Sequence, residues 1–316
     1  MSRKKRTGWI RKIMAAAAAA GLGVCALAGT AGALADGGDA RTKESGGGQI
    51  SYLGPEGTYT HEAAQLFFGG TAELNPRESV DEAVADVTGG AAEYAVIPQE
   101  NTLGGAVVGY VDALIRAENV YVVGEVILPI SQTLMGVPGA ELSDIRTVCS
   151  HAQGLTQSAE WRRENLPEAE TRETASTAEA ARYVAEQGDP ALAAVAAPGA
   201  AELYGLEVLA ENVQISDANK TRFYVLSMEA GTEGDRAVFV AECDGSRIDD
   251  ILIGVHEAGL EMVSLHDRPE GSRLGRYYFV IEVTDEEGIS EAQIDAVTAL
   301  DEVRFAGVFE HIEKNK

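Results

Sequence analysis

The chain has 316 residues, which is enough for two domains at the usual size of about 100–200 residues each. Hydrophobic residues make up 45% of the chain and charged residues 24%, as is typical of a soluble globular protein. The formal net charge of -25 excludes nucleic acid and anionic membrane surfaces as partners held by bulk electrostatics.

The first 35 residues have the pattern of an export signal. Basic residues at 3–6 and 11–12 precede an uncharged Ala/Gly-rich run at 13–35, which ends in the cleavage pattern Ala33-Leu34-Ala35. We expect cleavage near Ala35 and a periplasmic or extracellular protein. An uncleaved membrane anchor is the alternative, but the Ala/Gly-rich run makes a weak span. Cleavage removes six basic and no acidic residues, so the net charge becomes -31 and any anion site must be a local basic pocket.

Beyond a polar Gly-rich linker at 36–48, short apolar strands alternate with helical stretches. A capping box of Ser79 and Glu82 opens one helix, and a second box, Ser176 and Glu179, opens a helix that ends at Gly188. This alternation predicts an α/β layer structure with parallel strands. The other expected elements are strands at 50–53, 94–97, 120–130, 147–149, 191–196, 206–210 and 224–226, helices at 60–68 and 154–165, and a loop at 98–105 that leads into a helix ending near 117.

The pattern changes after a Gly-containing linker at 231–234. The rest of the chain is predicted to form a ferredoxin-like βαββαβ unit, with Ser290 and Gln293 as a third capping box. We therefore expect one domain at 49–229 and another at 235–316. The elements of the second domain are expected at 237–242, 247–258, 262–265, 277–283, 290–302 and 304–309.

Four polar segments lie where predicted strands end or begin. Alone, each is equally typical of a solvated turn, but together they supply hydroxyls, amides and cations suited to a small polyanion. A glycine-containing turn before a helix also offers backbone N–H groups to an anion. The segments are GPEGTYT at 54–60, PQENTLGG at 98–105, SHAQGLTQ at 150–157 and NKTRF at 219–223.

In their order and spacing, these segments resemble the motifs of prephenate dehydratases: GPxGTY, PxEN[S/T]xxG, SHxQxxxQ and NxTRF. The resemblance covers about residues 50–311. It implies a two-lobed catalytic domain like a periplasmic binding protein, with lobes at about 50–125 plus 206–227 and at 126–205. It also implies that the C-terminal βαββαβ unit is an ACT domain, which regulates and dimerises such enzymes.

The resemblance further implies a cleft that binds prephenate between the lobes, with no metal and no other cofactor. Family roles carry over to individual side chains by matching the motifs. The implied catalytic residues are Thr221, Glu100, Asn101, Ser150 and Gln157. The implied substrate-binding residues are Arg222, Phe223, Thr58, Thr102, Asn219 and Lys220.

The implied reaction accounts for a site of amides, hydroxyls and cations. Prephenate loses carbon dioxide and its ring hydroxyl to give aromatic phenylpyruvate, so the site must hold carboxylates and assist the departing hydroxide. Thr221 is expected to donate a hydrogen bond to that hydroxide, because its own pKa is too high for an ordinary proton source. Glu100 is expected to relay a proton to Thr221 if burial raises its pKa.

The C-terminal domain departs from the resemblance at the segments that would contact a phenylalanine effector. The corresponding effector residues are Gly245, Arg268 and Pro269, but His266-Asp267 replaces the usual Glu-Ser, and Gly245-Ser246-Arg247 replaces a Gly-Ala-Leu stretch. These departures count against feedback by phenylalanine. They leave assembly into a homodimer or homotetramer as the expected role of the domain.

Two other functions remain open from the sequence. Arogenate dehydratase uses the same scaffold on a substrate with an amine in place of the keto group, and an exported binding protein could keep the two-lobed fold without turnover. The two cysteines outside the signal, Cys149 and Cys243, lie in different predicted domains and are expected to be buried free thiols, although export permits a disulfide.

Overall fold

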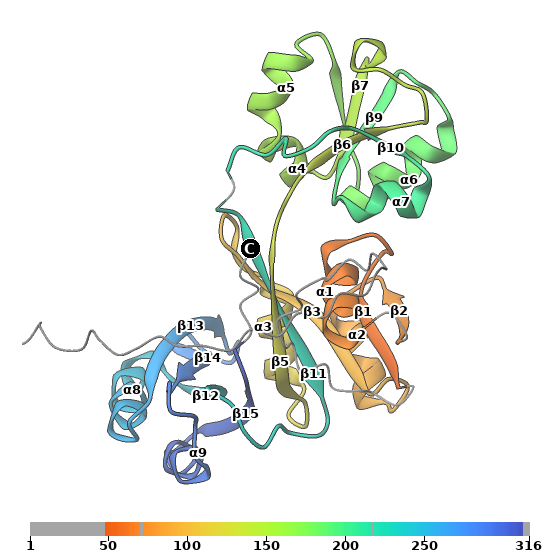
Figure 1. Cartoon of the computed structure of the whole chain (residues 1–316). Helices are drawn as coiled ribbons and strands as arrows, with labels where there is room; N and C mark the ends of the chain where they lie inside the picture. Colours follow the sequence, from red (N-terminus) through yellow and green to blue (C-terminus); the bar gives the residue numbers. More distant parts are fainter. Residues whose placement is uncertain (1–47, 70–71, 217, 312–316) are drawn as a thin grey trace, which may run out of the picture. The chain divides into compact units, whose positions relative to one another are not determined.

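The computed structural model describes residues 48–69, 72–216 and 218–311, all within one compact unit, Arg41–Lys316. The expected export signal and nearly all of the expected linker lie outside the described residues. In the described part, no helix has both the length and the apolar character needed to cross a membrane. The strands form two sheets, which carry two lobes and a C-terminal domain (Figure 1).

Lobe 1 is built on the central strands of the first sheet, in the order β5-β11-β3-β1-β2, with the short strand β4 beside β3. β1 runs parallel to β2 and β3, whereas β11 runs antiparallel to β3 and β5, so the expectation of parallel strands holds in part. Its elements are β1 Gln49–Leu53, α1 Tyr59–Phe68, β2 Glu73–Arg77, α2 Val80–Thr88, β3 Tyr94–Asn101, β4 Gly105–Ala106, α3 Val108–Arg116, β5 Tyr121–Pro129 and β11 Lys220–Ser227.

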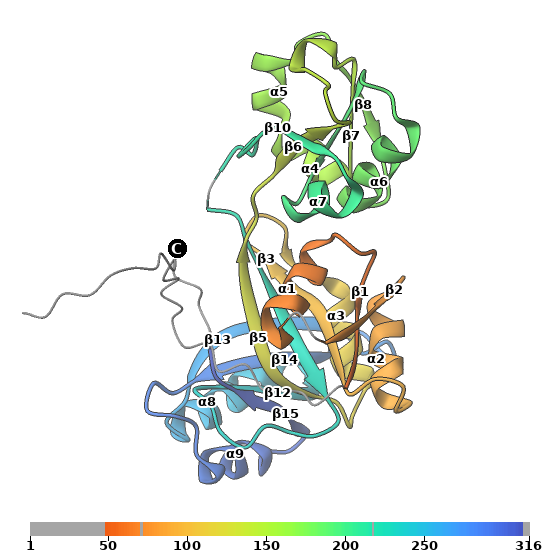
Figure 2. The same ribbon diagram turned by 45° about the vertical axis from the view of Figure 1, so that its right-hand side comes forward.

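Lobe 2 is built on the second sheet, in the order β10-β6-β9-β7-β8. The chain passes between the sheets at residues 130–132, which follow β5, and through the described residues 211–216 and 218–219, which precede β11 (Figure 2). Its elements are β6 Thr133–Gly136, the 3-10 turn Leu142–Asp144, β7 Thr147–Ser150, α4 Ala152–Gln157, α5 Ala159–Asn165, β8 Glu170–Glu173, α6 Thr177–Gln187, β9 Leu192–Ala196, α7 Gly199–Tyr204 and β10 Glu207–Ala210.

The C-terminal domain has the predicted βαββαβ order. Its strands lie in the order β13-β14-β12-β15, which is the ferredoxin-like arrangement, and both halves of the predicted Ser290–Gln293 capping box are present. Its elements are β12 Arg236–Asp244, the 3-10 turn Gly245–Arg247, α8 Ile248–Glu257, β13 Glu261–Pro269, β14 Arg276–Thr284, α9 Glu291–Thr298 and β15 Val303–Phe309.

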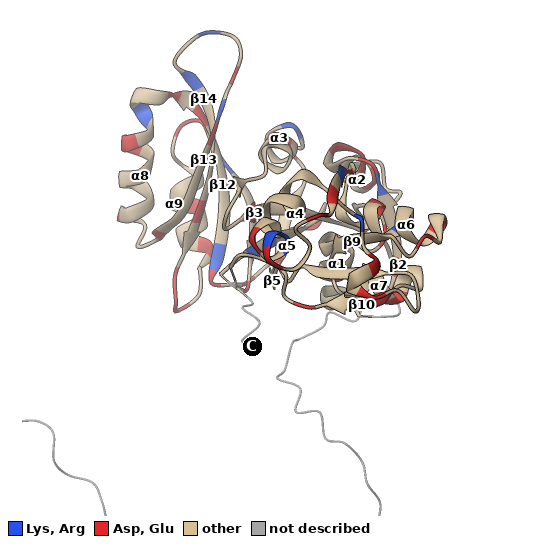
Figure 3. Ribbon diagram, turned by 90° about the horizontal axis from the view of Figure 1, so that it is seen from above, with Lys and Arg blue, Asp and Glu red and all other residues tan. Residues whose placement is uncertain are grey.

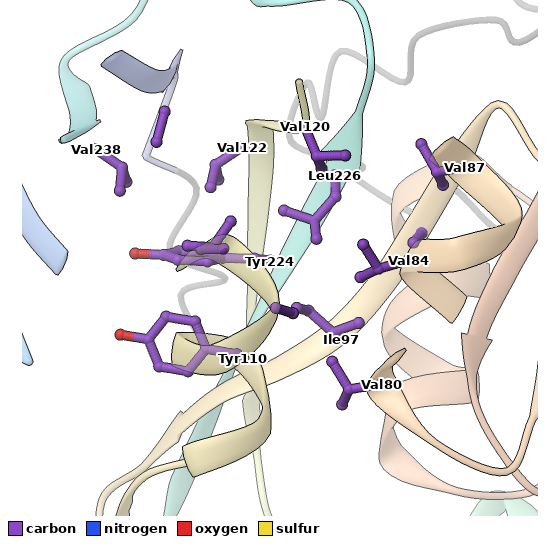
Figure 4. Close-up of a cluster of buried hydrophobic side chains, with 14 of the residues drawn as sticks. Val80, Val84, Val87, Ile97, Tyr110, Val120, Val122, Tyr224, Leu226 and Val238 are labelled. Carbon is purple, nitrogen blue, oxygen red and sulfur yellow. The ribbon is translucent and has the colours of Figure 1, made fainter. Parts of the chain in front are cut away.

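The C-terminal domain and lobe 1 share one sheet and one hydrophobic cluster. β15 meets β5 at the pair Gly307–Val122, where a Cβ on residue 307 would lie 2.1 Å from the Val122 carbonyl oxygen, so only glycine allows this approach. The shared cluster packs Ile97, Tyr224 and Leu226 of lobe 1 with Val238 of β12 (Figure 4). A contiguous buried cluster of this kind resists separation of its parts.

Side chains alternate across the first sheet and so fill two separate layers. On β11, Phe223 and Val225 pack against α1, whereas Tyr224 and Leu226 pack into the shared cluster with α2 and α3. The face of β11 that carries Tyr224 is therefore the face that the C-terminal domain covers.

Several expectations differ from the structure. The segment 98–105 is not a loop: β3 continues to Asn101 and turns back into β4. The helix expected at 154–165 is interrupted at Ser158, whose hydroxyl donates to the Gly154 carbonyl at 2.8 Å. Residues 206–210, expected in lobe 1, instead belong to lobe 2, where Glu207–Ala210 form β10 beside β6, because strand pairing is set by contacts distant in sequence.

Candidate active site

A cavity of about 800 Å³ is lined by side chains of both lobes. Lobe 1 contributes the turn before α1 and the adjoining ends of β2, β3 and β11, and lobe 2 contributes the starts of α4 and α6. Of the residues expected from the sequence, five line this cavity. They are Thr58, Asn101, Gln157, Asn219 and Thr221.

A β-bulge directs Asn101 toward Thr221. Thr221 pairs with Asn101 and Arg222 with Glu100, but Phe223 pairs with Pro98, so Gln99 is an extra residue on β3. Because one extra residue reverses the alternation of side chains, Asn101 shares the face of Thr221. Gln99 is fully buried on the other face, where its amide donates to the Tyr110 hydroxyl at 3.1 Å.

The amide of Asn101 is held in one orientation by backbone donors. Its Oδ1 accepts hydrogen bonds from the backbone N–H groups of Leu103 and Gly104, both at 3.0 Å. Its Nδ2 must therefore face the strand end, where it donates to Asn219 Oδ1 at 2.9 Å and to Thr221 Oγ1 at 2.8 Å. This arrangement fixes the orientation of both partners.

The orientation of the Asn101 amide leaves two hydrogen-bond donors for a ligand at the cavity, one on Thr221 and one on Asn219. Thr221 accepts from Asn101, so its own hydroxyl hydrogen is left to donate to a ligand. Asn219 uses its oxygen for Asn101, and its Nδ2, in a side chain only 1% exposed, has no partner among the described residues. A buried, unsatisfied donor beside a cavity is costly unless a ligand or water completes it.

A second amide pair lies in the wall between the lobes. Gln132, just beyond β5, donates from Nε2 to Gln157 Oε1 at 2.9 Å, while its Oε1 has no partner within the described ranges. Tyr59 lies in the same wall and donates its hydroxyl to the Ser131 carbonyl at 2.6 Å. Burial raises the pKa of Tyr59, so the phenol stays protonated at neutral pH.

The cavity wall also contains groups that favour an anion. Thr58 and Ser176 cap the N-termini of α1 and α6, and both caps line the cavity. N–H groups of a first helical turn that the cap does not use, together with the helix dipole, attract negative charge. Two cations, Arg77 and Arg182, also line the cavity; Arg77 is paired with Asp86, and Arg182 lies 4.0 Å from Glu179.

Six expected site residues do not line the cavity, and their packing explains why. Ser150 is fully buried under α4 and donates to the Val195 carbonyl at 2.6 Å. Phe223 is 2% exposed in the layer under α1. Thr102 exchanges hydrogen bonds with the backbone of Lys220, which ties the β3–β4 turn to β11, and neither residue contributes to the cavity wall.

Glu100 and Arg222 lie on the face of the sheet away from the cavity. The Arg222 guanidinium lies 2.7 Å from Glu282 and 3.5 Å from Glu125, two carboxylates that are almost completely buried. Burial opposes the charge on Arg222, but Glu282 and Glu125 outweigh it and raise the Arg222 pKa. Glu100 acts electrostatically on Arg222 and Tyr110, so the structure does not bring Glu100 to Thr221 for the expected relay.

The residues expected to contact an effector make contacts within this chain instead. Arg268 makes a two-pronged ion pair with Asp112 of α3, at 2.7 and 3.2 Å, and His266 hydrogen-bonds Tyr110. Pro269 ends β13, and Gly245 donates its N–H to the Gly275 carbonyl at 2.8 Å. This segment therefore holds the C-terminal domain against α3 of lobe 1.

Cys149 and Cys243 are both buried and free, as expected, and burial raises the pKa of each thiol. Within the described ranges, no group of three or more His, Cys, Asp or Glu side chains could hold a metal ion. Acidic residues are spread over the elements of both lobes and the C-terminal domain, so the anion-favouring groups of the cavity act locally (Figure 3).

Sequence reasoning missed several residues of the cavity wall. Gln132 follows a strand end, and Arg77 ends β2, which is too short and polar to be recognised. Ser176 was identified as a helix cap, a position that presents free N–H groups and could have been read as part of the site.

The chain is similar to proteins of one known family. The family model for prephenate dehydratase matches residues 50–231. The prephenate dehydratase of Amycolatopsis methanolica is 36% identical over 275 residues, which cover 83% of this chain and 88% of the relative. The bifunctional chorismate mutase/prephenate dehydratase of Neisseria gonorrhoeae is 36% identical over 238 residues, which cover 74% of this chain and 66% of that longer relative.

Two solved structures share the fold. The prephenate dehydratase of Arthrobacter aurescens, in complex with L-Phe, is 29% identical, with a TM-score of 0.74 over 83% of this chain and 90% of the other. GqqA, described as a novel type of quorum quenching acylase, is 28% identical, with a TM-score of 0.73 over 83% and 97%. The match of the family model and the identity to curated relatives over most of their length show that the chain belongs to the prephenate dehydratase family.

Proposed function

We propose that the protein is a prephenate dehydratase, a lyase that converts prephenate to phenylpyruvate. Family membership supports the reaction. The observation that carries the site is the fixed amide of Asn101, which presents the Thr221 hydroxyl and the Asn219 amide as donors to the cavity.

The chemistry of the reaction matches such donors. The bond from the ring to its carboxylate breaks, carbon dioxide leaves, and the electron pair enters the ring as the bond to the ring hydroxyl breaks. The departing oxygen carries developing negative charge, which a hydrogen bond from Thr221 stabilises, and water supplies the proton that completes the leaving water molecule. Because Asn101 has already oriented Thr221, little reorganisation is needed in the transition state.

The remaining groups of the wall suit the rest of the substrate. The pyruvyl carboxylate is held by the N-terminus of α1 or α6 and by the cations Arg77 and Arg182. Polar groups of the bound molecule pair with the two amide atoms that the protein leaves without partners, Asn219 Nδ2 and Gln132 Oε1. Tight holding by both lobes positions the reacting bonds.

The direct test is an assay of purified protein lacking residues 1–35. Formation of phenylpyruvate from prephenate is the expected result, and Thr221→Ala, folded as judged by circular dichroism, is expected to lose nearly all of it. Arogenate is assayed beside prephenate, because an amine-bearing substrate that turned over faster would make the protein an arogenate dehydratase. Saturable binding of prephenate without turnover would instead indicate a binding protein.

An N-acyl substrate belongs in the same assay. The neighbour described as a quorum quenching acylase matches this chain about as well as the prephenate dehydratase complex does. Acyl release with no phenylpyruvate formation would replace the proposed function by an amide hydrolase.

We further propose that the C-terminal domain is an ACT domain that assembles the chain into a homodimer or homotetramer. Its ferredoxin-like strand order supports this, and light scattering on the purified protein tests it. The L-Phe complex of the Arthrobacter aurescens relative makes phenylalanine the effector to test, although here Arg268 is engaged with Asp112. A shift of Tm or of turnover with L-phenylalanine would show that regulation is kept.

We also propose export with cleavage near Ala35, on the evidence of the basic and apolar pattern at residues 3–35. Expression of the full chain in its host, followed by N-terminal sequencing of the secreted protein, tests this. A mature N-terminus near Asp36 is expected, and a chain retained in the membrane fraction would favour the uncleaved anchor.

A further inference from the structure

The buried carboxylate of Glu282, on β14 of the C-terminal domain, is the centre of a cluster that reaches into lobe 1. Glu282 is 1% exposed and accepts from four donors. The donors are Arg222 Nη1 at 2.7 Å, the Tyr224 hydroxyl at 2.8 Å, Arg236 Nη1 at 3.2 Å and the Ser264 hydroxyl at 3.3 Å. A buried carboxylate with this many donors is held firmly in one place.

Two of those donors, Arg222 and Tyr224, are on β11, the strand that carries Thr221. Arg222 is the residue directly after Thr221, and its side chain points to the opposite face of the sheet. On that face the guanidinium lies between Glu282 and Glu125 of β5, and Glu125 is also bonded to His311. The end of β11 that presents Thr221 is thus held on its opposite face by the ion pair between Arg222 and Glu282 of the C-terminal domain.

We propose that Glu282 is a positioning residue for the proposed reaction. It holds β11 through Arg222 and Tyr224, and thereby sets the position of the Thr221 hydroxyl in the cavity. The C-terminal domain accordingly takes part in building the active site, in addition to any role in assembly or regulation.

The surrounding structure supports a role in position. The β-bulge that directs Asn101 to Thr221 lies beside Arg222, where the ladder hydrogen bonds between β3 and β11 are disrupted. A strand is least constrained by its neighbours at such a point, so side-chain anchors there determine where it lies. The shared hydrophobic cluster joins the same strand to Val238 of β12 (Figure 4) and to Val280 of β14, which keeps Glu282 in a constant position relative to β11.

The proposal separates two roles for Arg222. If Arg222 bound substrate directly, as the sequence resemblance implies, its removal would raise KM independently of Glu282. If it acts through Glu282, removal of either residue should produce the same defect in kcat, and removal of both should add little. A displacement of about 1 Å in a catalytic group can lower the rate by about 100-fold, so the effect is measurable.

The experiment compares Glu282→Gln with Asp112→Asn in the full mature chain. Asp112→Asn is the matched control, because it removes another ion pair between lobe 1 and the C-terminal domain, to Arg268, without touching β11. We expect Glu282→Gln to lower kcat at least about tenfold, with KM within about threefold, and Asp112→Asn to leave kcat within about twofold. Unchanged kcat in folded Glu282→Gln, or an equal loss in Asp112→Asn, would overturn the proposal.

A double-mutant cycle that combines Glu282→Gln with Arg222→Gln then tests whether Glu282 acts through Arg222. The double variant is expected to match the slower single variant, whereas losses in kcat/KM that multiply would assign Arg222 to the substrate. Should Glu282→Gln not fold, Tyr224→Phe replaces it, since it removes one hydrogen bond from a neutral donor and leaves every ion pair in place. A loss of about threefold in its kcat supports the proposal, and unchanged kcat contradicts it.

A second readout does not depend on the proposed function. Backbone amides of the segment 219–223 are expected to exchange hydrogen at least about tenfold faster in Glu282→Gln than in Asp112→Asn. If the wild-type protein did not turn over prephenate, the proposed function would fail while this measurement still decided whether Glu282 positions β11. Equal exchange in the two variants would show that it does not.

Discussion

The two faces of β11 hold opposite kinds of polar chemistry. The cavity face presents neutral donors with unfilled hydrogen-bonding capacity, the Thr221 hydroxyl and the Asn219 amide next to it. The other face carries Arg222, whose charge is paired with the buried carboxylates of Glu282 and Glu125. The guanidinium of Arg222 therefore stabilises the scaffold, and neutral dipoles face the ligand.

This difference follows from what each kind of group does well. A buried cation needs partners of fixed position, and a cavity that fills and empties does not supply them. A neutral donor held by a rigid amide is ready to stabilise charge that develops only during the reaction.

The largest effect is expected from Thr221→Ala. Loss of a positioned donor to developing negative charge should lower kcat by about 100–1000-fold, with little change in KM. Thr221→Ser keeps the hydroxyl and serves as the control, with kcat within about tenfold of wild type. Rates of phenylpyruvate formation measure both, and comparable rates in the Ala and Ser variants would remove Thr221 from the chemistry.

The next effect is expected from Asn219→Asp. The carboxylate can still accept from Asn101, so the orientation of Thr221 is kept, but the free donor is replaced by a negative charge that faces a dianion. We expect kcat/KM to fall by about 10–100-fold. Full activity in this variant would show that Asn219 Nδ2 does not donate a hydrogen bond to the substrate.

A smaller effect is expected from Arg182→Gln, which removes a half-exposed cation from the cavity wall. KM should rise about threefold to tenfold while kcat stays constant, and the difference should shrink at high ionic strength because salt screens exposed charges. Arg163→Gln, on the surface of α5, is the matched control. A KM that rose equally in both variants would indicate a general charge effect.

The smallest effect concerns stability. The hydrogen bond between His311 and Glu125 raises the pKa of His311, although burial acts to lower it. A raised pKa stabilises the folded state fully below the unfolded pKa of about 6.5, and this contribution is lost as the pH rises through the folded value. We expect His311→Gln to lower Tm by about 2–4 °C at about pH 5.5, and by less than about 1 °C at about pH 9. A deficit that grew with pH would contradict this sign.

Local signals in the sequence predicted local structure well. The βαββαβ order of the C-terminal domain and the caps at Ser79, Ser176 and Ser290 are confirmed, because apolar alternation and capping involve residues close in sequence. The strands β2 and β8 escaped prediction because they lie at sheet edges and carry few apolar residues.

The site could be predicted in part for the same reason. Motif spacing located Thr221, Asn101 and Asn219, all of which line the cavity. It could not show that a bulge at Gln99 shifts the alternation of β3, so that Asn101 shares the face of Thr221 and Glu100 shares the face of Arg222, since the register of a strand pair depends on both strands. The partners of Arg222 could not be predicted from the sequence either, because Glu282 lies 60 residues away along the chain in another domain.

Because of the shared hydrophobic cluster, we expect that the gene cannot be shortened to the part that encodes the cavity. Every residue that lines the cavity is encoded before β12 begins, so a premature stop codon soon after Ser227 would leave the whole site translated. The ribosome would nevertheless release a chain without Val238, Val280 and Phe309, and the apolar faces of Ile97 and Leu226 would meet water or a chaperone. Such an allele is expected to behave as a null, with its product degraded, although no codon of the cavity has changed.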